Sequence, residues 1–381
     1  MQIIIYTMTK KLAIFLNLGD SVETHQKSGQ WERFTSEYLD QYSQNFRHVY
    51  IFSYGVKTNP SKLPQNCTIL PNTKKIHRYL YTFLIPFLHA KELKTCHVSR
   101  TMQTTGGIPA IISQILYKIP AIVTYGYNYT NFAQLNTNKF IAFLTNIYTS
   151  VILNLATKII VTTPASEKKL DKHKHKLLLI PNGVNTHKFQ TKPNYRLHKP
   201  VRILSIGRLT LQKQYRLAIS GLAKLPPKIK TQIKYTIIGN GELENELQQL
   251  AQRKKIKLEI IDQVPHSKIP SSLKSADIYL HTSVIEGHPK SLLEAMAVGL
   301  PCLVVNSSKH VYQFLSNHQN ALFSEPSEKN IATNLNNMIK NLQTRNIIGK
   351  NASETIRQKF DLPTLIKTEI SILNKIATQI K

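Results

Sequence analysis

Short apolar runs alternate with longer amphipathic segments along the chain. In its first half, residues 12–18, 49–54, 121–125 and 158–163 have the length and composition of buried strands, and residues 28–42 have the periodicity of a helix. Buried strands that alternate with helices are typical of a parallel sheet covered by helices. The pattern therefore predicts an α/β fold for this part of the chain.

The alternation pauses near residues 190–200, where polar side chains and two prolines have the composition of a linker. It then resumes in the same form, with strand-like runs at residues 201–206, 234–238, 257–261, 278–282 and 303–306. A chain of 381 residues is also longer than one ordinary core requires. We therefore predict two Rossmann-like, doubly wound parallel-sheet domains, at residues 1–190 and 200–360.

Residues 140–157 contain no charged side chain, but several Thr, Ser and Asn residues interrupt the segment. This composition argues against a membrane-spanning helix. Six apolar residues recur at helical spacing and predict an amphipathic helix whose apolar side is buried in the protein. They are Phe140, Phe143, Leu144, Ile147, Val151 and Leu155.

The charge of the chain is strongly positive, with a formal net charge of +29. Between Gln41 and Ser166 the single acidic residue is Glu92, against a dozen Lys and Arg. Such a surface attracts polyanions or anionic lipid headgroups. Residues 74–88, basic and then aromatic, could lie at a membrane interface, although Pro86 limits them to a broken helix. An anionic substrate, a nucleic acid and an ordinary solvated surface remain alternatives.

Two cations follow a predicted strand in the second half. Gly207 and Arg208 come directly after residues 201–206, and Lys213 lies five residues beyond Arg208. Parallel strands place such residues at the carboxyl edge of the sheet, where Arg can bind phosphate with two hydrogen bonds and Lys adds a mobile charge. Either could be an ordinary surface residue, but the strand-end position favours a phosphate site.

A predicted helix from about Pro289 to Gly299 supplies a second anion-binding element. Proline suits the first helical position, and glycine suits the residue after the helix. Gly287 lacks a Cβ where the backbone would approach a ligand. The free backbone N–H groups of the first turn belong to Lys290, Ser291 and Leu292.

Two carboxylates, Glu286 and Glu294, lie eight residues apart across this loop-to-helix junction. One could accept hydrogen bonds from sugar hydroxyls and the other from a ribose. A helix-capping role for Glu286 and a solvent-facing role for Glu294 are the ordinary alternatives. His288, between glycine and proline, is expected to contribute its backbone rather than to act as an acid or base.

Together these motifs resemble glycosyltransferase family 4, the retaining, nucleotide-sugar-dependent enzymes of GT-B fold in glycosyl transferases group 1. The resemblance is strong from about residue 181 to residue 306 and weak before residue 156. It rests on residues 286–301 with their paired glutamates, 205–209 with Lys213, 237–241, 179–185 with Phe189, and 275–278.

The resemblance implies that the two domains face each other across a cleft and that a last helix, at about residues 361–381, packs back on the first domain. Arg208 and Lys213 would neutralise the leaving diphosphate. Glu286 would contact the donor sugar and stabilise charge, and a nucleophilic role for it is the less favoured reading. Donor binding would also involve Gly207, Gly287, His288, Lys290, Ser291 and Leu292, with Glu294 on the ribose.

The chain departs from the family pattern mainly on the acceptor side. Gly126 stands where many members have a histidine, so no catalytic histidine is carried over. Tyr125 or Tyr127 is the candidate replacement in acceptor binding, together with Gly19 in the first loop. Gln214 replaces the glycine that is usual after the phosphate-binding lysine.

Cofactors are not expected. The three cysteines, Cys67, Cys96 and Cys302, are scattered and lack metal-ligand spacing, and no Asp-x-Asp motif is present. Two cations at a diphosphate remove the need for a metal ion. Sparse cysteine is typical of a reducing compartment, so a cytoplasmic location is expected, with peripheral attachment to the inner face of the cytoplasmic membrane.

The sequence thus predicts a hexosyl- or N-acetylhexosaminyl-transferase that acts on a lipid-linked or polysaccharide acceptor in cell-surface glycan or glycolipid biosynthesis, lipopolysaccharide included. A nucleotide-sugar epimerase or a glycogen-synthase-like enzyme on the same fold is the alternative, because fold alone does not define chemistry. A nucleic-acid-binding protein is more remote, because arginine is scarce and lysine is dispersed.

Overall fold

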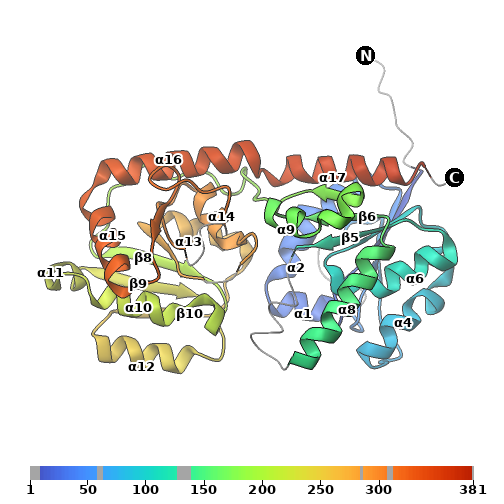
Figure 1. Ribbon diagram of the computed structural model, residues 1–381, viewed down its shortest axis with the longest axis horizontal. Helices are drawn as coiled ribbons and strands as arrows, with labels where there is room; N and C mark the ends of the chain where they lie inside the picture. Colours follow the sequence, from blue (N-terminus) through green and yellow to red (C-terminus); the bar gives the residue numbers. More distant parts are fainter. Residues whose placement is uncertain (1–8, 58–62, 127–138, 284–285, 307–311, 380–381) are drawn as a thin grey trace, which may run out of the picture. The chain divides into compact units, whose positions relative to one another are not determined.

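The computed structural model describes residues 9–57, 63–126, 139–283, 286–306 and 312–379. These residues form two compact units (Figure 1). Unit 1 consists of Met1–Pro181 and Pro363–Lys381, and unit 2 consists of Asn182–Leu362. No helix in the described ranges is long and apolar enough to cross a membrane.

Unit 1 is built on a seven-stranded parallel sheet with the order β3-β2-β1-β4-β5-β6-β7. Most of its strands are apolar, as is usual where helices cover both faces of a sheet. The strands are β1 (Lys11–Phe15), β2 (His48–Phe52), β3 (Cys67–Leu70), β4 (Val98–Thr101), β5 (Ala121–Tyr125), β6 (Lys158–Val161) and β7 (Leu177–Leu179).

The helices of unit 1 connect these strands, except for the last helix, α17, which follows unit 2 in the chain (Figure 1). They are α1 (Val22–Lys27), α2 (Gln30–Arg33), a π-helical segment (Phe34–Leu39), α3 (Asp40–Ser43), α4 (Arg78–Leu88), α5 (Ala90–Leu93), α6 (Gly107–Tyr117), α8 (Lys139–Leu155), α9 (Pro164–Lys169) and α17 (Leu362–Ile376), with 3₁₀ turns at Thr104–Gly106 and Asp171–Lys176.

The last helix, α17, is tied to the centre of unit 1. Glu369 on α17 forms a buried ion pair with Arg100 at β4 and accepts a hydrogen bond of 2.6 Å from the Tyr42 hydroxyl. All three side chains are buried. Residues 269 positions apart thus neutralise each other inside one core.

Unit 2 repeats the same plan with a six-stranded parallel sheet in the order β10-β9-β8-β11-β12-β13. Strand β8 is central, and the order reverses between β8 and β11 because later strands are added on its other side. The strands are β8 (Val201–Ile206), β9 (Ile233–Ile238), β10 (Leu258–Ile261), β11 (Ile278–His281), β12 (Cys302–Val305) and β13 (Leu322–Ser324).

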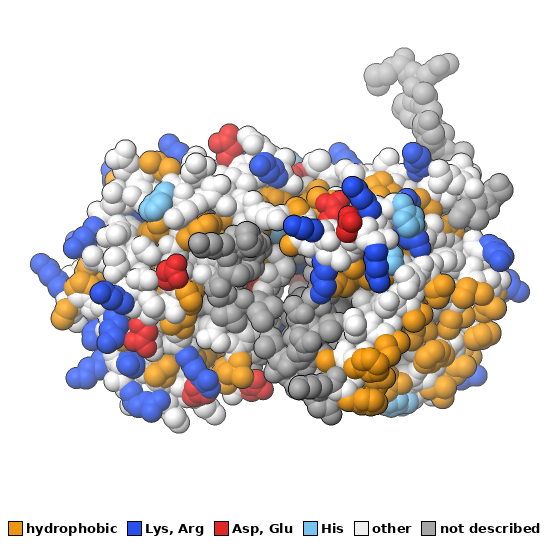
Figure 2. Space-filling model, viewed as in Figure 1, with side chains coloured by type: hydrophobic (Ala, Val, Ile, Leu, Met, Phe, Trp, Pro, Cys, Tyr) orange, Lys and Arg blue, Asp and Glu red, His pale blue; other side chains and the backbone are white. Residues whose placement is uncertain are grey.

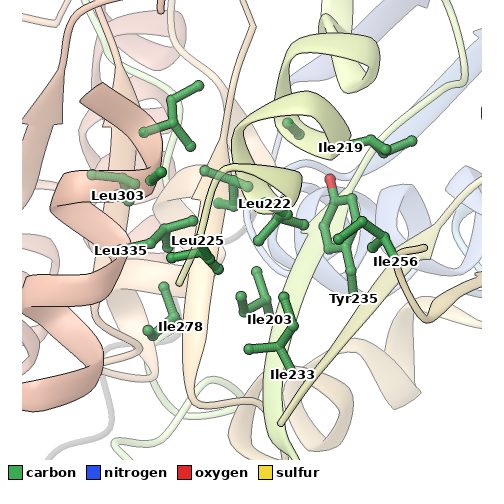
Figure 3. Close-up of a cluster of buried hydrophobic side chains, with 14 of the residues drawn as sticks. Ile203, Ile219, Leu222, Leu225, Ile233, Tyr235, Ile256, Ile278, Leu303 and Leu335 are labelled. Atoms are coloured by element: carbon green, nitrogen blue, oxygen red, sulfur yellow. The ribbon is translucent and has the colours of Figure 1, made fainter. Parts of the chain in front are cut away.

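Helices cover both faces of this sheet, and their apolar sides form its core. Figure 3 shows one such cluster, in which Ile203 of β8 and Tyr235 of β9 meet Leu222 of α10. The helices are α10 (Tyr215–Ala223), α11 (Pro227–Lys230), α12 (Glu244–Lys254), α13 (Ile269–Lys274), α14 (Lys290–Ala297), α15 (Glu328–Lys340) and α16 (Leu342–Lys359), with 3₁₀ turns at Leu211–Lys213 and His266–Lys268.

The prediction of two doubly wound parallel-sheet domains is confirmed. The division falls after Pro181, whereas the sequence analysis placed a linker at residues 190–200. Residues 182–200 pack on unit 2 instead: Lys192, for example, is buried and donates to the carbonyl oxygen of Ala276 at 2.7 Å.

One prediction about a helix is wrong. Helix α8 was expected to bury its apolar side, but all six residues of the predicted side are exposed to solvent. The opposite side, with Ala142, Ile152 and Leu153, packs on unit 1 instead. Periodicity shows that a helix has an apolar side, but not what covers that side.

Candidate functional site

The candidate site lies at the carboxyl edge of the unit 2 sheet, where β8 and β11 are neighbours. These two strands pair in parallel, with Ile203 opposite Ile278 and Leu204 opposite Tyr279. The connections from their ends lead away to opposite sides, because the strand order reverses here. In doubly wound sheets this is the position at which ligands bind.

Glycines let the loops after β8 and β9 stack closely. Gly207, at φ +154°, donates its N–H to the Ile238 carbonyl at 3.0 Å. A Cβ on Gly239, at φ +145°, would overlap the Gly207 carbonyl oxygen. The Leu209 N–H reaches the Asn240 carbonyl at 2.8 Å. The sequence therefore forms a compact double loop that fixes the backbone around Arg208.

Lys213 and Glu286 form a largely buried ion pair across this edge. The carbonyl of Lys213 accepts a hydrogen bond of 2.7 Å from the Thr282 hydroxyl, so the loops after β8 and β11 are joined directly. The Ser283 hydroxyl donates to Glu286 at 3.0 Å. Burial would raise the pKa of Glu286, but Lys213, His281 and the Ser283 hydrogen bond together hold it below the ordinary value.

His281 lies behind this pair, at the end of β11. Its Nε2 is 3.9 Å from a Glu286 carboxylate oxygen and 3.0 Å from the Tyr312 hydroxyl. Burial lowers the pKa of His281 to about 4, against the opposing effect of Glu286. The ring is therefore neutral near pH 7, and it shapes the back of the site without adding charge.

Arg208 is exposed at the same edge, directly after Gly207. Within the described ranges its guanidinium has no ion-pair partner. Gln214, one residue after Lys213, has φ +53°, a conformation that glycine adopts more easily. The turn that presents Lys213 is thus retained without the glycine.

Helix α14 begins beside Glu286. Its first residue is Lys290, so the helix begins one residue later than predicted. Pro289 is the N-cap residue and not the first helical residue. Gly287 and Lys290 are exposed, Ser291 is half-buried and Leu292 is buried. The first turn of α14 therefore lies at the carboxyl edge, where a helix N-terminus favours an anion.

The other end of α14 is capped as the sequence indicates. Gly299, at φ +69°, donates its N–H to the Met296 carbonyl at 2.8 Å, and Leu300 donates to Ala295 at 2.9 Å. This is the pair of bonds of a Schellman motif. It closes the helix and fixes the position of Glu294 along it.

Glu294 is buried on α14 rather than facing solvent. One carboxylate oxygen is 3.1 Å from the Nε2 of His266, which lies in the 3₁₀ turn after β10. Two connections at the carboxyl edge thus converge on one carboxylate. A buried carboxylate with a polar partner can accept hydrogen bonds from ligand hydroxyls.

His288 is held inside unit 2. Its Nδ1 accepts a hydrogen bond from the Asn182 backbone N–H at 3.1 Å, and the Asn182 side chain donates to the His288 carbonyl at 2.9 Å. Its ring packs against Phe314 and Phe360. Burial, and then Lys290, lowers the pKa of His288 to about 4. These contacts favour a structural role for the ring.

The acceptor-side candidates lie in unit 1. Gly19, at φ +82°, follows β1 in a loop where the Asp20 carboxylate accepts from the Asn17 amide at 2.8 Å and is 3.2 Å from His25. Tyr125 is buried in the core at the end of β5, and burial raises the pKa of its hydroxyl. Tyr127 lies outside the described residues.

Sequence reasoning missed His266, His281 and Asn182 as neighbours of the site. His266 and His281 were detectable, since each lies at or just beyond the carboxyl end of a predicted strand, the edge at which ligand-binding residues gather. Asn182 lies in the segment 179–185 that contributed to the resemblance, but no local pattern linked it to His288. The described residues contain no group of three His, Cys, Asp or Glu side chains placed to hold a metal ion.

Residues 187–355 match the sequence model of the family described as "Glycosyl transferases group 1". The matched residues lie in unit 2.

Among curated proteins, the chain is 38% identical over 136 residues to the amylovoran biosynthesis glycosyltransferase AmsK of Erwinia amylovora, covering 34% of this chain and 32% of the relative. It is 24% identical over 269 residues to the phosphatidylinositol N-acetylglucosaminyltransferase GPI3 subunit of Saccharomyces cerevisiae, covering 67% of this chain and 56% of the relative. The first relatives are matched over between 32% and 56% of their own length.

Solved structures share the fold over almost the whole chain. Anabaena HepE in complex with UDP-glucose has a TM-score of 0.72 at 16% identity, covering 96% of this chain and 99% of that one. Sucrose-phosphate synthase from Thermosynechococcus elongatus has a TM-score of 0.79 at 16% identity, with the same coverage. The two-domain GT-B architecture is therefore confirmed.

Proposed function

We propose that this protein is a retaining glycosyltransferase that moves a sugar from a nucleoside diphosphate to a lipid-linked or polysaccharide acceptor in cell-surface glycan biosynthesis. The observation that carries the proposal is the Lys213–Glu286 pair, with Arg208 and the start of α14 at the same edge of the unit 2 sheet. The family match covers this part of the chain.

The arrangement suits the charge that develops in the reaction. The bond between the anomeric carbon and a phosphate oxygen breaks, and negative charge grows on the leaving diphosphate. Fixed cations and helix N–H groups stabilise such charge without reorganisation. Lys213 and Arg208 supply the cations, and Lys290, Ser291 and Leu292 supply N–H groups, so the reaction needs no metal ion.

Glu286 would accept hydrogen bonds from the donor sugar and stabilise positive charge on the anomeric carbon. The lowered pKa of Glu286 keeps the carboxylate ionised for this role. Glu294, held by His266, would bind the ribose. The acceptor hydroxyl oxygen forms the new bond to the anomeric carbon on the face that the diphosphate leaves, and its proton passes to the leaving phosphate.

Relatives and neighbours support this assignment by their names. AmsK is named for amylovoran biosynthesis, and HepE was solved with UDP-glucose. WaaG, with a TM-score of 0.71, is described as a glycosyltransferase involved in lipopolysaccharide biosynthesis. A nucleotide-sugar donor and a glycan acceptor of the cell surface are therefore the substrates we propose.

A thermal-shift screen of UDP-, GDP-, ADP- and dTDP-sugars tests the donor site. One donor should raise the Tm, and Lys213→Ala and Glu294→Gln should each abolish the rise. Lys224→Ala and Glu354→Gln are matched controls that should keep the rise, since both residues are exposed and lie away from the edge, Lys224 directly after α10 and Glu354 on α16. If both site variants respond like the parent chain, the site assignment is wrong.

Incubation of the stabilising donor with the enzyme then separates transfer from epimerisation. Without an acceptor, the donor should stay unchanged apart from slow hydrolysis. Conversion of the donor into its epimer would contradict the transferase assignment.

A further inference from the structure

Helix α8 presents an apolar side to solvent. Phe140 is 65% exposed and Phe143 is 59% exposed, and Leu144, Ile147, Val151 and Leu155 follow at helical spacing. The side that packs on the protein holds small and medium residues such as Ala142 and Ile152. Burying large aromatic side chains is favourable, so an exposed row of them indicates a partner.

Two neighbouring helices extend this surface. Helix α6 packs between α4 and α8: the Tyr117 hydroxyl donates to the Pro86 carbonyl at 2.9 Å, and the Gln114 amide donates to the Leu155 carbonyl at 2.8 Å. Figure 2 shows apolar side chains gathered over this region of unit 1. We call this surface the apolar face; it consists of Tyr79, Leu80, Phe83, Phe87, Leu88, Ile115, Leu116, Phe140, Ile141, Phe143, Leu144, Ile147, Val151 and Leu155.

Exposed cations lie at the helix ends that border the apolar face. Lys74 and Lys75 precede α4, and Lys91 and Lys94 follow it by a few residues. Lys118 ends α6 directly after its apolar residues. Glu92 is the one acid between residues 41 and 166, the stretch of sequence that contains α4, α6 and α8.

This combination identifies the partner. A second copy of the chain would bring two basic borders together and be opposed by charge repulsion. An acidic partner protein would match the border but would not by itself require a row of Phe and Leu. An anionic bilayer offers both parts, because headgroups attract the lysines and the acyl boundary accepts the apolar side chains.

We propose that the apolar face of α4, α6 and α8 docks unit 1 on the surface of an anionic lipid bilayer. The three helices lie along the surface, with one side on the protein and the other among the headgroups and upper acyl chains. This inference stands on unit 1 alone and does not depend on the donor site in unit 2.

Vesicle co-sedimentation of the full chain tests the proposal. We expect binding to vesicles of phosphatidylcholine mixed with phosphatidylglycerol, and much weaker binding to phosphatidylcholine alone. The double variant Leu144→Ser with Ile147→Ser should lower the partition coefficient by about 10-fold or more. Leu342→Ser with Ile347→Ser is the matched control, since these residues are equally exposed on α16, and it should bind like the parent.

The basic border is tested separately. Lys74→Gln with Lys75→Gln should weaken binding to the anionic vesicles by roughly 30-fold, since each of the two lysines near such a surface contributes about 1 kcal/mol. Raising the salt concentration should reduce the difference between this variant and the parent.

Several outcomes would overturn the proposal. They are equal vesicle binding of the α8 variant and its parent, absence of vesicle binding by a folded parent chain, and a parent chain that is dimeric in solution while the α8 variant is monomeric. The donor-induced rise in Tm should be unchanged in the α8 variant. A failure of the donor screen would therefore leave the vesicle result, and this proposal, intact.

Discussion

Lys213 and Glu286 pair across the point where the strand order of unit 2 reverses, although 73 residues separate them in the chain. Each follows a different central strand, and the Thr282 hydroxyl binds the two connections together. The cation that would meet a diphosphate is therefore positioned by the carboxylate that would meet its sugar. Loss of either side chain should disturb both ends of the donor.

Lys213→Ala should lower kcat with the stabilising donor by about 10²- to 10³-fold, because a fixed charge on the leaving group is removed. Glu286→Gln should have a comparable effect, since it deprives Lys213 of its partner and the sugar of an ionised acceptor. Steady-state kinetics would measure both. Lys224→Ala should stay within twofold of the parent, and a similar small change in Lys213→Ala would exclude its role.

The pH dependence of stability should depend on the titration of His288. Its pKa is lowered to about 4 in the folded protein from 6.5 in the unfolded chain, so the unfolded chain binds a proton more readily. The free energy of unfolding should therefore reach its maximum above pH 6.5 and should decrease by about 3 kcal/mol as the pH is lowered to 4. His288→Asn can retain an acceptor for the Asn182 N–H and should reduce this fall.

Urea unfolding at several pH values between 7 and 4.5 measures the effect as the difference between His288→Asn and the parent chain. A difference that stays constant with pH would show that His288 titrates alike in the folded and unfolded states.

Gly207→Ala and Gly239→Ala should separate activity from stability. A Cβ at Gly207 would lie 2.8 Å from the Lys213 Cε, the flexible end of a side chain. Lys213 can move, so the cost in stability comes mainly from backbone strain at φ +154° and should be only about 1 kcal/mol, while kcat should fall about 10-fold.

A Cβ at Gly239 meets the Gly207 backbone, which cannot move without opening the double loop. Gly239→Ala should therefore lower the free energy of unfolding by about 3 kcal/mol. Thermal unfolding and kcat measured on both variants test the contrast. Equal loss of stability in the two would contradict it.

Glu369→Ala should destabilise unit 1 by about 3 to 5 kcal/mol, because it leaves the buried Arg100 without a counter-charge. Urea unfolding measures the change. Glu354→Ala, at an exposed glutamate on α16, should change stability by less than about 0.5 kcal/mol. Comparable effects of the two variants would show that the buried pair carries little energy.

The sequence predicted best what depends on local pattern. The runs 121–125 and 201–206 coincide with β5 and β8, because buried parallel strands are continuous apolar segments. The candidate donor residues followed from strand ends and one helix start, so Arg208, Lys213, Glu286 and Glu294 do lie on the loops and helix of one sheet edge.

What the sequence could not predict depends on distant partners. Strand β4 contains Ser99, Arg100 and Thr101, and this polar composition does not resemble a buried strand. In the structure the charge of Arg100 is neutralised by Glu369, which lies far away in the sequence. The contact between Glu294 and His266 was likewise not predicted, because the two residues are 28 positions apart and no local spacing indicates that they meet. The apolar side of helix α8 was wrongly expected to be buried, because periodicity shows that a helix has an apolar side but not whether the protein covers it.

The ion pair between β4 and α17 has a consequence for how the chain is made. Arg100 leaves the ribosome early, but its counter-charge is synthesised 269 residues later, after every residue of unit 2. Domains generally fold in order during synthesis. Here unit 1 should acquire its final stability only after all of unit 2 has been synthesised, so unit 2 can fold first.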